Sequence, residues 1–204
     1  MTQTIEQITD FSTIEDAIEA WVLSASGLSS LTATKDSKGN TIPKVRWAGF
    51  DLPRKRPYAV ITIVSQPSQG HPWSSRVKTD DYVEKTYSHP FAWNTQISFF
   101  TDSYDENGAA IRATAYRFAQ NTLNRAFLVP AKSLLDAVNI AYAPMSQNIQ
   151  PGVLEGVDSD KYIHQASVEF TFSGIAQTKL KDTDWFETIT VPTEANSGLT
   201  LSGA

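Results

Sequence analysis

The chain contains three histidines and no cysteine, which restricts its options for metal binding and nucleophilic catalysis. His71, His89 and His164 lie far apart, and no HExxH or HxH spacing would place two imidazoles on one metal ion. Without a thiol there is no thiolate zinc site, disulfide or cysteine nucleophile. No GxSxG, P-loop or glycine-rich dinucleotide turn is present. We therefore expect a protein that is not an enzyme, with no catalytic residue, no metal site and no cofactor.

One segment has the oxygen-rich composition of a calcium loop. Residues 103–108, SYDENG, place side-chain oxygens at alternate positions and a glycine at the sixth. The twelfth position, where a calcium loop carries a bidentate glutamate, is Thr114. The segment is better explained as a turn from a strand into a helix, with Asp105 or Asn107 as the N-cap.

Arg54, Lys55 and Arg56 form the one dense basic cluster of the chain. The cluster could bind phosphate groups or an acidic partner, including DNA. It could also be the exposed approach to a strand, kept soluble by its charge, and we favour this second interpretation because such runs are common on surfaces.

Residues 65–90 are the least regular part of the chain and are longer than most connections in compact domains. They carry Trp73, Tyr82 and Tyr87, with Arg76 among them. Aromatic anchors with a charged rim are typical of protein interfaces. We therefore predict an arm with a protruding hairpin that reaches beyond its own subunit. An arm folded over its own core is the alternative. The predicted partner-binding residues are Arg54, Lys55, Arg56, Trp73, Arg76, Tyr82 and Tyr87.

The composition narrows the classes of function. The 204 residues are enough for one domain that buries about 70% of its unfolded surface. A formal net charge of -5 gives no general attraction to nucleic acid or to anionic membranes. The first thirty residues lack a basic region followed by an apolar run, and no run approaches the ~20 apolar residues of a membrane span. We expect a soluble protein made in the cytoplasm, without a signal peptide.

Two segments alternate apolar and polar residues with the period of a β-strand, residues 91–101 and residues 162–173. Two shorter strands are expected at residues 44–47 and 58–64. The second of these, YAVITIV, is a nearly continuous β-branched run of the kind found in interior strands. In the last strand, the residues expected on the buried face are Tyr162, His164, Ala166, Val168, Phe170 and Phe172.

The first helix is predicted from a capping-box pattern at residues 12–15, STIE, with Ser12 as its N-cap. Apolar residues then recur at helical spacing as far as Ala25, and Gly27 stands where a left-handed C-terminal cap would lie. The polar residues 29–41 predict a loop.

A second helix is expected to begin near Asn107 or Gly108 and to continue to Ala126. Small residues along it would let it lie close to a sheet. Pro130 should end or kink this helix, and residues 133–138 predict a final turn or a further helix.

The remaining segments complete an α+β domain. We expect strands at residues 139–144 and 185–191, and a flexible polar tail at residues 192–204. The predicted fold is a mostly antiparallel β-sheet with helices packed on one face, formed by residues 1–191, with residues 65–90 as an extended loop or arm.

The order of these elements resembles that of phage neck and tail-terminator proteins. The similar segments are the amphipathic helix of residues 14–28, the proline-led strand of residues 56–63, and the strands at residues 96–100 and 164–172. An acidic-glycine turn into an alanine-rich helix also matches. The resemblance covers roughly residues 14–191, and the long arm and the polar tail depart from it.

The resemblance implies a virion protein that binds its neighbours. Family members look like small α/β subunits that form a homo-hexameric ring at the neck, where the ring terminates the tail tube and joins it to head-completion or connector proteins. The implied partners are other copies of the chain, the tail tube protein and the head-completion protein, with the tail sheath as a further candidate. DNA would only pass through the ring lumen, and no membrane is involved. The chain would be located in the virion, and in the host cytoplasm during assembly.

Other classes of function stay open at this stage. Another head–tail connector, or an adaptor or chaperone domain outside a virion, would show the same pattern of elements. An enzyme would need a pocket built from scattered polar residues such as Asp80, Asp81 and Glu84, although no motif supports one.

Overall fold

The structure, a computed structural model, describes residues 3–49, 56–67, 70–78, 82–102, 114–155 and 162–182. Three α-helices accompany a curled sheet of eight strands and a separate two-stranded sheet in these ranges. All strand pairs are antiparallel except β4 with β5, so the predicted α+β class with a mostly antiparallel sheet is confirmed. The elements are β1 (Gln3–Gln7), α1 (Phe11–Ser26), the 3-10 turn η1 (Leu28–Ser30), β2 (Thr34–Lys35), β3 (Thr41–Ile42), β4 (Val45–Trp47), β5 (Tyr58–Ser65), β6 (Trp73–Lys78), β7 (Val83–Asp102), α2 (Thr114–Arg125), α3 (Val129–Asp136), β8 (Ala141–Pro144), β9 (Gln150–Glu155) and β10 (Tyr162–Asp182).

Two long strands, β7 and β10, extend through the whole sheet. Their antiparallel ladder continues without a register shift from Asp102 opposite Ile163 to Val83 opposite Asp182. At one end β5 and β4 extend the sheet beyond β7, while β8 and β9 pair with β10. We call this part, together with the helices, the body.

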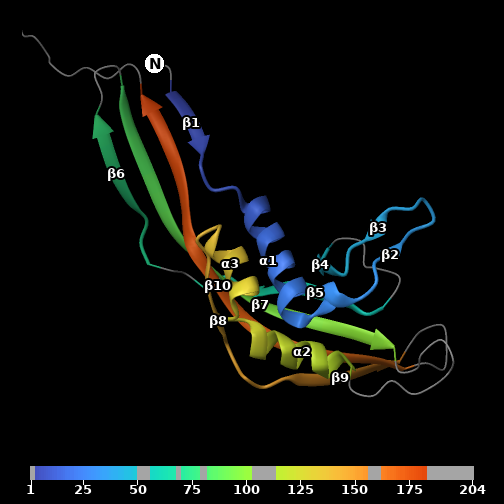
Figure 1. The fold of residues 1–204 in the computed structure, drawn as a ribbon. Helices are drawn as coiled ribbons and strands as arrows, with labels where there is room; N and C mark the ends of the chain where they lie inside the picture. Colours follow the sequence, from blue (N-terminus) through green and yellow to red (C-terminus); the bar gives the residue numbers. More distant parts are fainter. Residues whose placement is uncertain are drawn as a thin grey trace, which may run out of the picture.

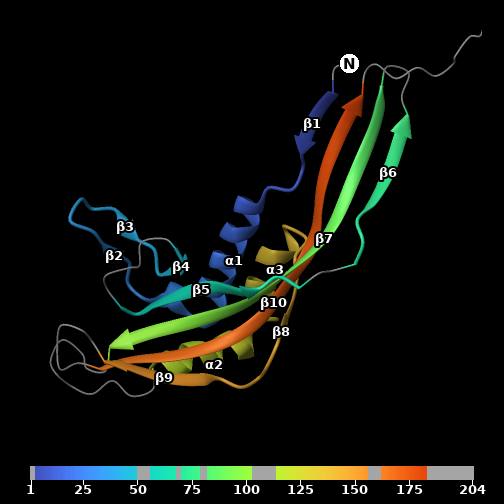
Figure 2. The same ribbon diagram turned by 180° about the vertical axis from the view of Figure 1, so that it is seen from behind.

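At the other end of the ladder, β6 pairs with β7 and β1 pairs with β10. We call these four strands the arm: β6, residues 83–90 of β7, residues 174–182 of β10, and β1. The arm projects away from the helices in both views (Figure 1, Figure 2).

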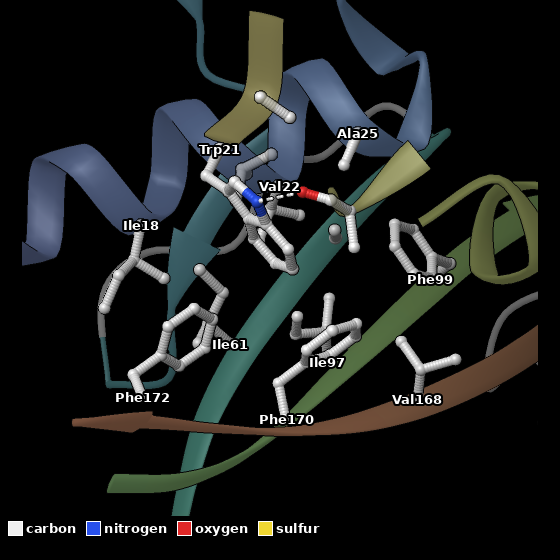
Figure 3. Packing of buried hydrophobic residues seen from close by; sticks show 14 of the residues in the cluster. Ile18, Trp21, Val22, Ala25, Ile61, Ile97, Phe99, Val168, Phe170 and Phe172 are labelled. Carbon is white, nitrogen blue, oxygen red and sulfur yellow. Dashed lines mark hydrogen bonds between the residues drawn. The ribbon is translucent and has the colours of Figure 1, made fainter. Parts of the chain in front are cut away.

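The core lies between the helices and one face of the body sheet (Figure 1). The register places Phe172 opposite Trp93 and Val168 opposite Ile97, and all four side chains are buried. Trp21 of α1 packs edge-on against Phe170 and Phe172, with ring centroids 5.0 and 5.4 Å apart (Figure 3). The predicted buried face of the last strand is therefore confirmed from Ala166 to Phe172, and the prediction that helices pack on one face is also confirmed.

The N-terminus of α1 differs from the prediction. The N-cap is Asp10 rather than Ser12. Its Oδ1 accepts hydrogen bonds from the Ser12 backbone N–H at 2.9 Å and from the Ser12 hydroxyl at 2.7 Å. The predicted capping box is wrong because a carboxylate two residues earlier is a stronger acceptor for the same orphan N–H groups. At the other end Gly27 has a φ of 83° and caps the helix, as predicted.

The segment expected to be a loop at residues 29–41 is partly ordered into regular structure. It begins with η1 and continues through β2, which pairs with β3. Asp36 organises the turn between them, because its Oδ1 accepts from the backbone N–H groups of Lys38 and Asn40, both at 2.8 Å. The strands predicted at residues 44–47 and 58–64 are confirmed as β4 and β5.

The second half of the chain follows the predicted order. The described part of α2 begins at Thr114, so the expected start near Asn107 or Gly108 and the segment of residues 103–108 lie outside the described residues. Pro130 lies in the first turn of α3, which is the further helix expected after it. The strand at residues 139–144 is confirmed as β8, whereas β9 was not predicted. The predicted strand at residues 185–191 and the tail also lie outside the described ranges.

Candidate partner-binding surface on the arm

The arm is more regular than its sequence indicates. Residues 65–90 were expected to be largely irregular, but β6 pairs with β7 from Trp73 opposite Ser88 to Lys78 opposite Val83. On its other side, this part of β7 pairs with residues 174–182 of β10. Residues 65–90 therefore supply two of the four strands of the arm. The strand of β10 that pairs with them comes about ninety residues later in the chain, so the local sequence does not reveal it.

Apolar side chains are exposed on both faces of the arm. Because directly opposed residues share a face, the register assigns Trp73, Val77 and Ile175 to one face and Ile5 and Tyr87 to the other. Their exposed fractions are 49%, 57%, 51%, 73% and 40%, respectively. Five large apolar side chains exposed on one projecting element make the arm a candidate protein interaction surface.

Interactions across the β7–β10 ladder stiffen the arm. Lys179 Nζ lies 3.0 Å from Glu84 Oε1, and this hydrogen bond raises the pKa of Lys179. Two residues further along β10, on the same face, Lys181 Nζ lies 5.2 Å from the ring centroid of Tyr82. These contacts fix side chains on one face, so the arm presents a defined surface.

The structure brings four of the predicted partner-binding residues together on the arm but divides them between its faces. Trp73 and Tyr87 belong to opposite faces, although their backbones are adjacent in the β6–β7 ladder. Arg76 is exposed on the same face as Tyr87. Tyr82 is half-buried and lies under Lys181. No single face therefore carries the whole predicted site.

Of the basic cluster, the structure describes Arg56, which lies in the body and not on the arm. Arg56 Nε lies 2.6 Å from Asp102 Oδ1, where β7 ends in the body. The half-buried guanidinium is therefore engaged within its own subunit. Arg54 and Lys55 lie outside the described residues.

The histidines do not converge. His71 and His89 are exposed near the base of the arm, whereas His164 is half-buried in the body part of β10. Within the ranges that the structure describes, no group of three or more His, Asp or Glu side chains could hold a metal ion. Of the three acidic residues considered for an enzyme pocket, Glu84 is paired with Lys179, while Asp80 and Asp81 lie outside the described ranges.

An open hollow of about 740 Å³ lies where the arm meets the helices. Its lining includes Phe91, Ile14 and Ile140 together with backbone of β10. Its one carboxylate, Asp10, is occupied in capping α1, and the hydrogen bonds from Ser12 and Thr13 lower its pKa. A general acid or base needs a pKa near the working pH, so Asp10 is not suited to that role.

Sequence reasoning missed three of the exposed apolar arm residues, Ile5, Val77 and Ile175. All three lie in strand segments that alternate weakly because neither face is deeply buried, so the period-two signal is faint. It also missed an exposed apolar corner between α2 and α3, formed by Phe127, Leu128 and Val129. Three consecutive apolar residues directly before a proline were the available signal for that corner.

No helix of the described ranges is long and apolar enough to cross a membrane. Comparison of the chain with protein-family models gave no match, and comparison with curated proteins also gave none. The function has to be inferred from the arm, the body and the sequence pattern themselves.

Proposed function

We propose that the chain is a structural virion protein of a tailed bacteriophage, which forms a ring at the neck, terminates the tail tube and joins it to the head-completion proteins. The observation that supports this most is the arm, a stiff four-stranded projection with apolar side chains exposed on both faces. A surface of that kind suits contact with other proteins. The neck location comes from the resemblance of the element order to tail-terminator proteins.

The body offers a scaffold for such contacts and little for catalysis. Its core is filled by interlocking aromatic and aliphatic side chains, and the hollow beside it has no carboxylate or imidazole poised for acid–base chemistry. A structural role requires only that the body hold the arm in a fixed direction.

The proposed partners are other copies of the chain in a homo-hexameric ring, the tail tube protein and the head-completion protein. A formal net charge of -5 disfavours tight binding of DNA, which suits a ring through which DNA passes without being held. The apolar corner at Phe127, Leu128 and Val129 is a second surface available for a layer above or below the ring.

Electron microscopy tests the proposal. We expect the purified protein, or the neck layer of the virion that contains it, to show a six-fold ring of this chain at the end of the tail tube. Tails assembled without the chain should have tubes of irregular length or fail to join heads. A neck layer with no ring of this chain, in a virion that contains it, would overturn the proposal.

A further inference from the structure

Among the described residues, the arm ends in one edge strand on each side. Its strand order is β1-β10-β7-β6, and in the described part of the chain β1 pairs only with β10 and β6 pairs only with β7. An edge strand presents backbone N–H and C=O groups that can pair with another chain. Neither β1 nor β6 contains a proline, which would block such an edge; β6 carries the charged residues Arg76 and Lys78, and β1 carries Glu6.

The directions of the two edge strands allow β6 of one copy to pair with β1 of another. Three successive antiparallel pairings separate β1 from β6, so these two strands run in opposite directions. If a second copy is placed beside the first by rotation about an axis along the arm, its β1 lies antiparallel to β6. The antiparallel order of strand directions then continues from the arm of one copy into the arm of the next. This contact uses two different surfaces, and such heterologous contacts close into a ring when the rotation from one copy to the next divides a full turn evenly.

The two edges also match in length and position. β6 has six residues and β1 has five. β6 lies opposite residues 83–88 of β7, which in turn lie opposite residues 177–182 of β10, and β1 lies opposite residues 178–182. Both edges therefore cover the same stretch of the arm. Each carries a largely exposed aliphatic side chain, Val77 on β6 and Ile5 on β1, that an added strand would cover.

We propose that β6 of one copy pairs antiparallel with β1 of the next copy, so that the arms of neighbouring copies form one continuous sheet. The occupant of each edge is a second copy of this chain. The inference rests on the proposed ring and specifies the contact that holds it together.

Introduced cysteines test this contact cleanly because the chain has none of its own. Val77 and Thr4 belong to the same face of the extended sheet, so a Val77→Cys/Thr4→Cys variant should form disulfides between neighbouring copies. Under oxidation we expect a ladder of covalent multimers on a non-reducing gel. A Val77→Cys/Glu6→Cys variant tests the alternative in which β6 and β1 of neighbouring copies are shifted by two residues. At least one of the two cysteine pairs should give the ladder of multimers.

Three controls decide the type of contact. Each single-cysteine variant should stay monomeric on the gel, because a head-to-tail contact keeps identical residues apart. Thr4→Cys combined with Ser133→Cys, an exposed position in α3 of the body, should give no ladder. Covalent dimers from Val77→Cys alone would show β6 paired with β6 and would overturn the inference.

Charge on the open edges should weaken the ring without unfolding the subunit. Ile5→Lys or Val77→Lys should raise the dissociation constant between copies by about tenfold or more, because lysine on an edge opposes strand addition. Thermal unfolding of the isolated subunit should change little, since both side chains are exposed.

The outcomes separate this inference from the proposed function. Six-fold rings at the neck with no disulfide ladder from either pair would overturn the β6–β1 contact and leave the terminator role standing. A ladder of covalent multimers from a protein that is absent from the neck would overturn the terminator role and leave the β6–β1 contact standing. The absence of any multimer, both in solution and in the virion, would overturn both.

Discussion

Trp21 and Tyr142 donate hydrogen bonds to the same acceptor, the carbonyl oxygen of Ala126 at the end of α2. The indole Nε1 lies 3.3 Å from this oxygen (Figure 3). The phenol oxygen of Tyr142 lies 2.7 Å from it. The residue four positions after Ala126 is Pro130, which has no N–H to offer this carbonyl. Two aromatic side chains from distant segments therefore replace the missing helical donor and connect α1, α2 and β8.

This shared acceptor predicts coupled stability losses. Tyr142→Phe should lower the free energy of unfolding by about 1 kcal/mol, because the Ala126 carbonyl keeps its bond from Trp21. Trp21→Phe should cost more, since it also shrinks the core. The double variant keeps an aromatic ring at both positions but leaves the carbonyl without either donor, so its loss should exceed the sum of the single losses by roughly 0.5 kcal/mol or more. Urea denaturation of the four proteins measures this, and simple additivity would contradict it.

Glu19 of α1 predicts a pH-dependent stability. Burial raises its pKa above the ordinary value of 4.5, and the nearby Arg46 only partly opposes this. The ionised form is therefore disfavoured in the folded state, and Glu19 should lower stability as the pH rises from its ordinary pKa through its raised folded pKa. Glu19→Gln should raise the melting temperature at neutral pH.

The control for Glu19 is the same comparison in acid. Below the ordinary pKa the carboxyl is protonated in both folded and unfolded chains, so the variant and the natural protein should melt together. Asp10→Asn, which changes another carboxylate but whose pKa is lowered rather than raised, should not reproduce the gain at neutral pH. An equal gain at all pH values would rule out the ionisation of Glu19 as the cause.

Gly174 marks the point where β10 passes from the body into the arm. A Cβ at this position would lie 2.8 Å from Cδ1 of Ile140 and 3.0 Å from Cε1 of Phe91. Gly174→Ala should therefore lower the free energy of unfolding by about 1–3 kcal/mol through overpacking. Gly152→Ala is a matched control, because its nearest neighbour would be 3.4 Å away, and it should change stability little.

A second substitution separates overpacking from other effects at Gly174. Ile140→Ala removes the Cδ1 atom that the new Cβ would meet, so it should relieve part of the loss in a Gly174→Ala background. If the two losses simply add, the clash with Ile140 is not the cause.

Assembly should be independent of metals and of imidazole groups. A binding protein has no step that needs a metal-bound water or a histidine proton, so ring formation and tail completion should survive EDTA. His71→Ala and His89→Ala are exposed changes and should assemble normally, while His164→Ala should affect stability at most. Failure of tail completion with EDTA, or with His89→Ala in a folded protein, would contradict a purely structural role.

The sequence was informative wherever one face of an element is buried. The alternation at residues 91–101 and 162–173 predicted both central strands, because the apolar positions of β7 and β10 pack under the helices. Their continuation into the arm was not predicted, since no face there is fully covered. The pairing of β1 with the last described residues of β10 depends on contacts about 175 residues apart, which no local pattern reveals.

The candidate site was predicted only in part, because residue type can be read from the sequence whereas the face of the arm on which a residue lies depends on strand register. Trp73 and Tyr87 were identified from their residue type and their irregular surroundings, and both are exposed on the arm. Their division between two faces follows from the register with Ser88 and Ser74, which only the ladder fixes. The N-cap was misassigned because Asp10 and Ser12 are both good caps, and their order along the chain does not decide between them.

The unbroken β7–β10 ladder also has a mechanical consequence. A pull on the arm along its length is carried by the two continuous backbones of β7 and β10, and a difference in load between them acts along the strands and across their hydrogen bonds, which lie perpendicular to the strands. The bonds are then strained in shear and resist together rather than opening one at a time as in a zipper. Because the helices pack on the body part of the same two strands, a load on the arm is transmitted directly to the sheet that forms one side of the core.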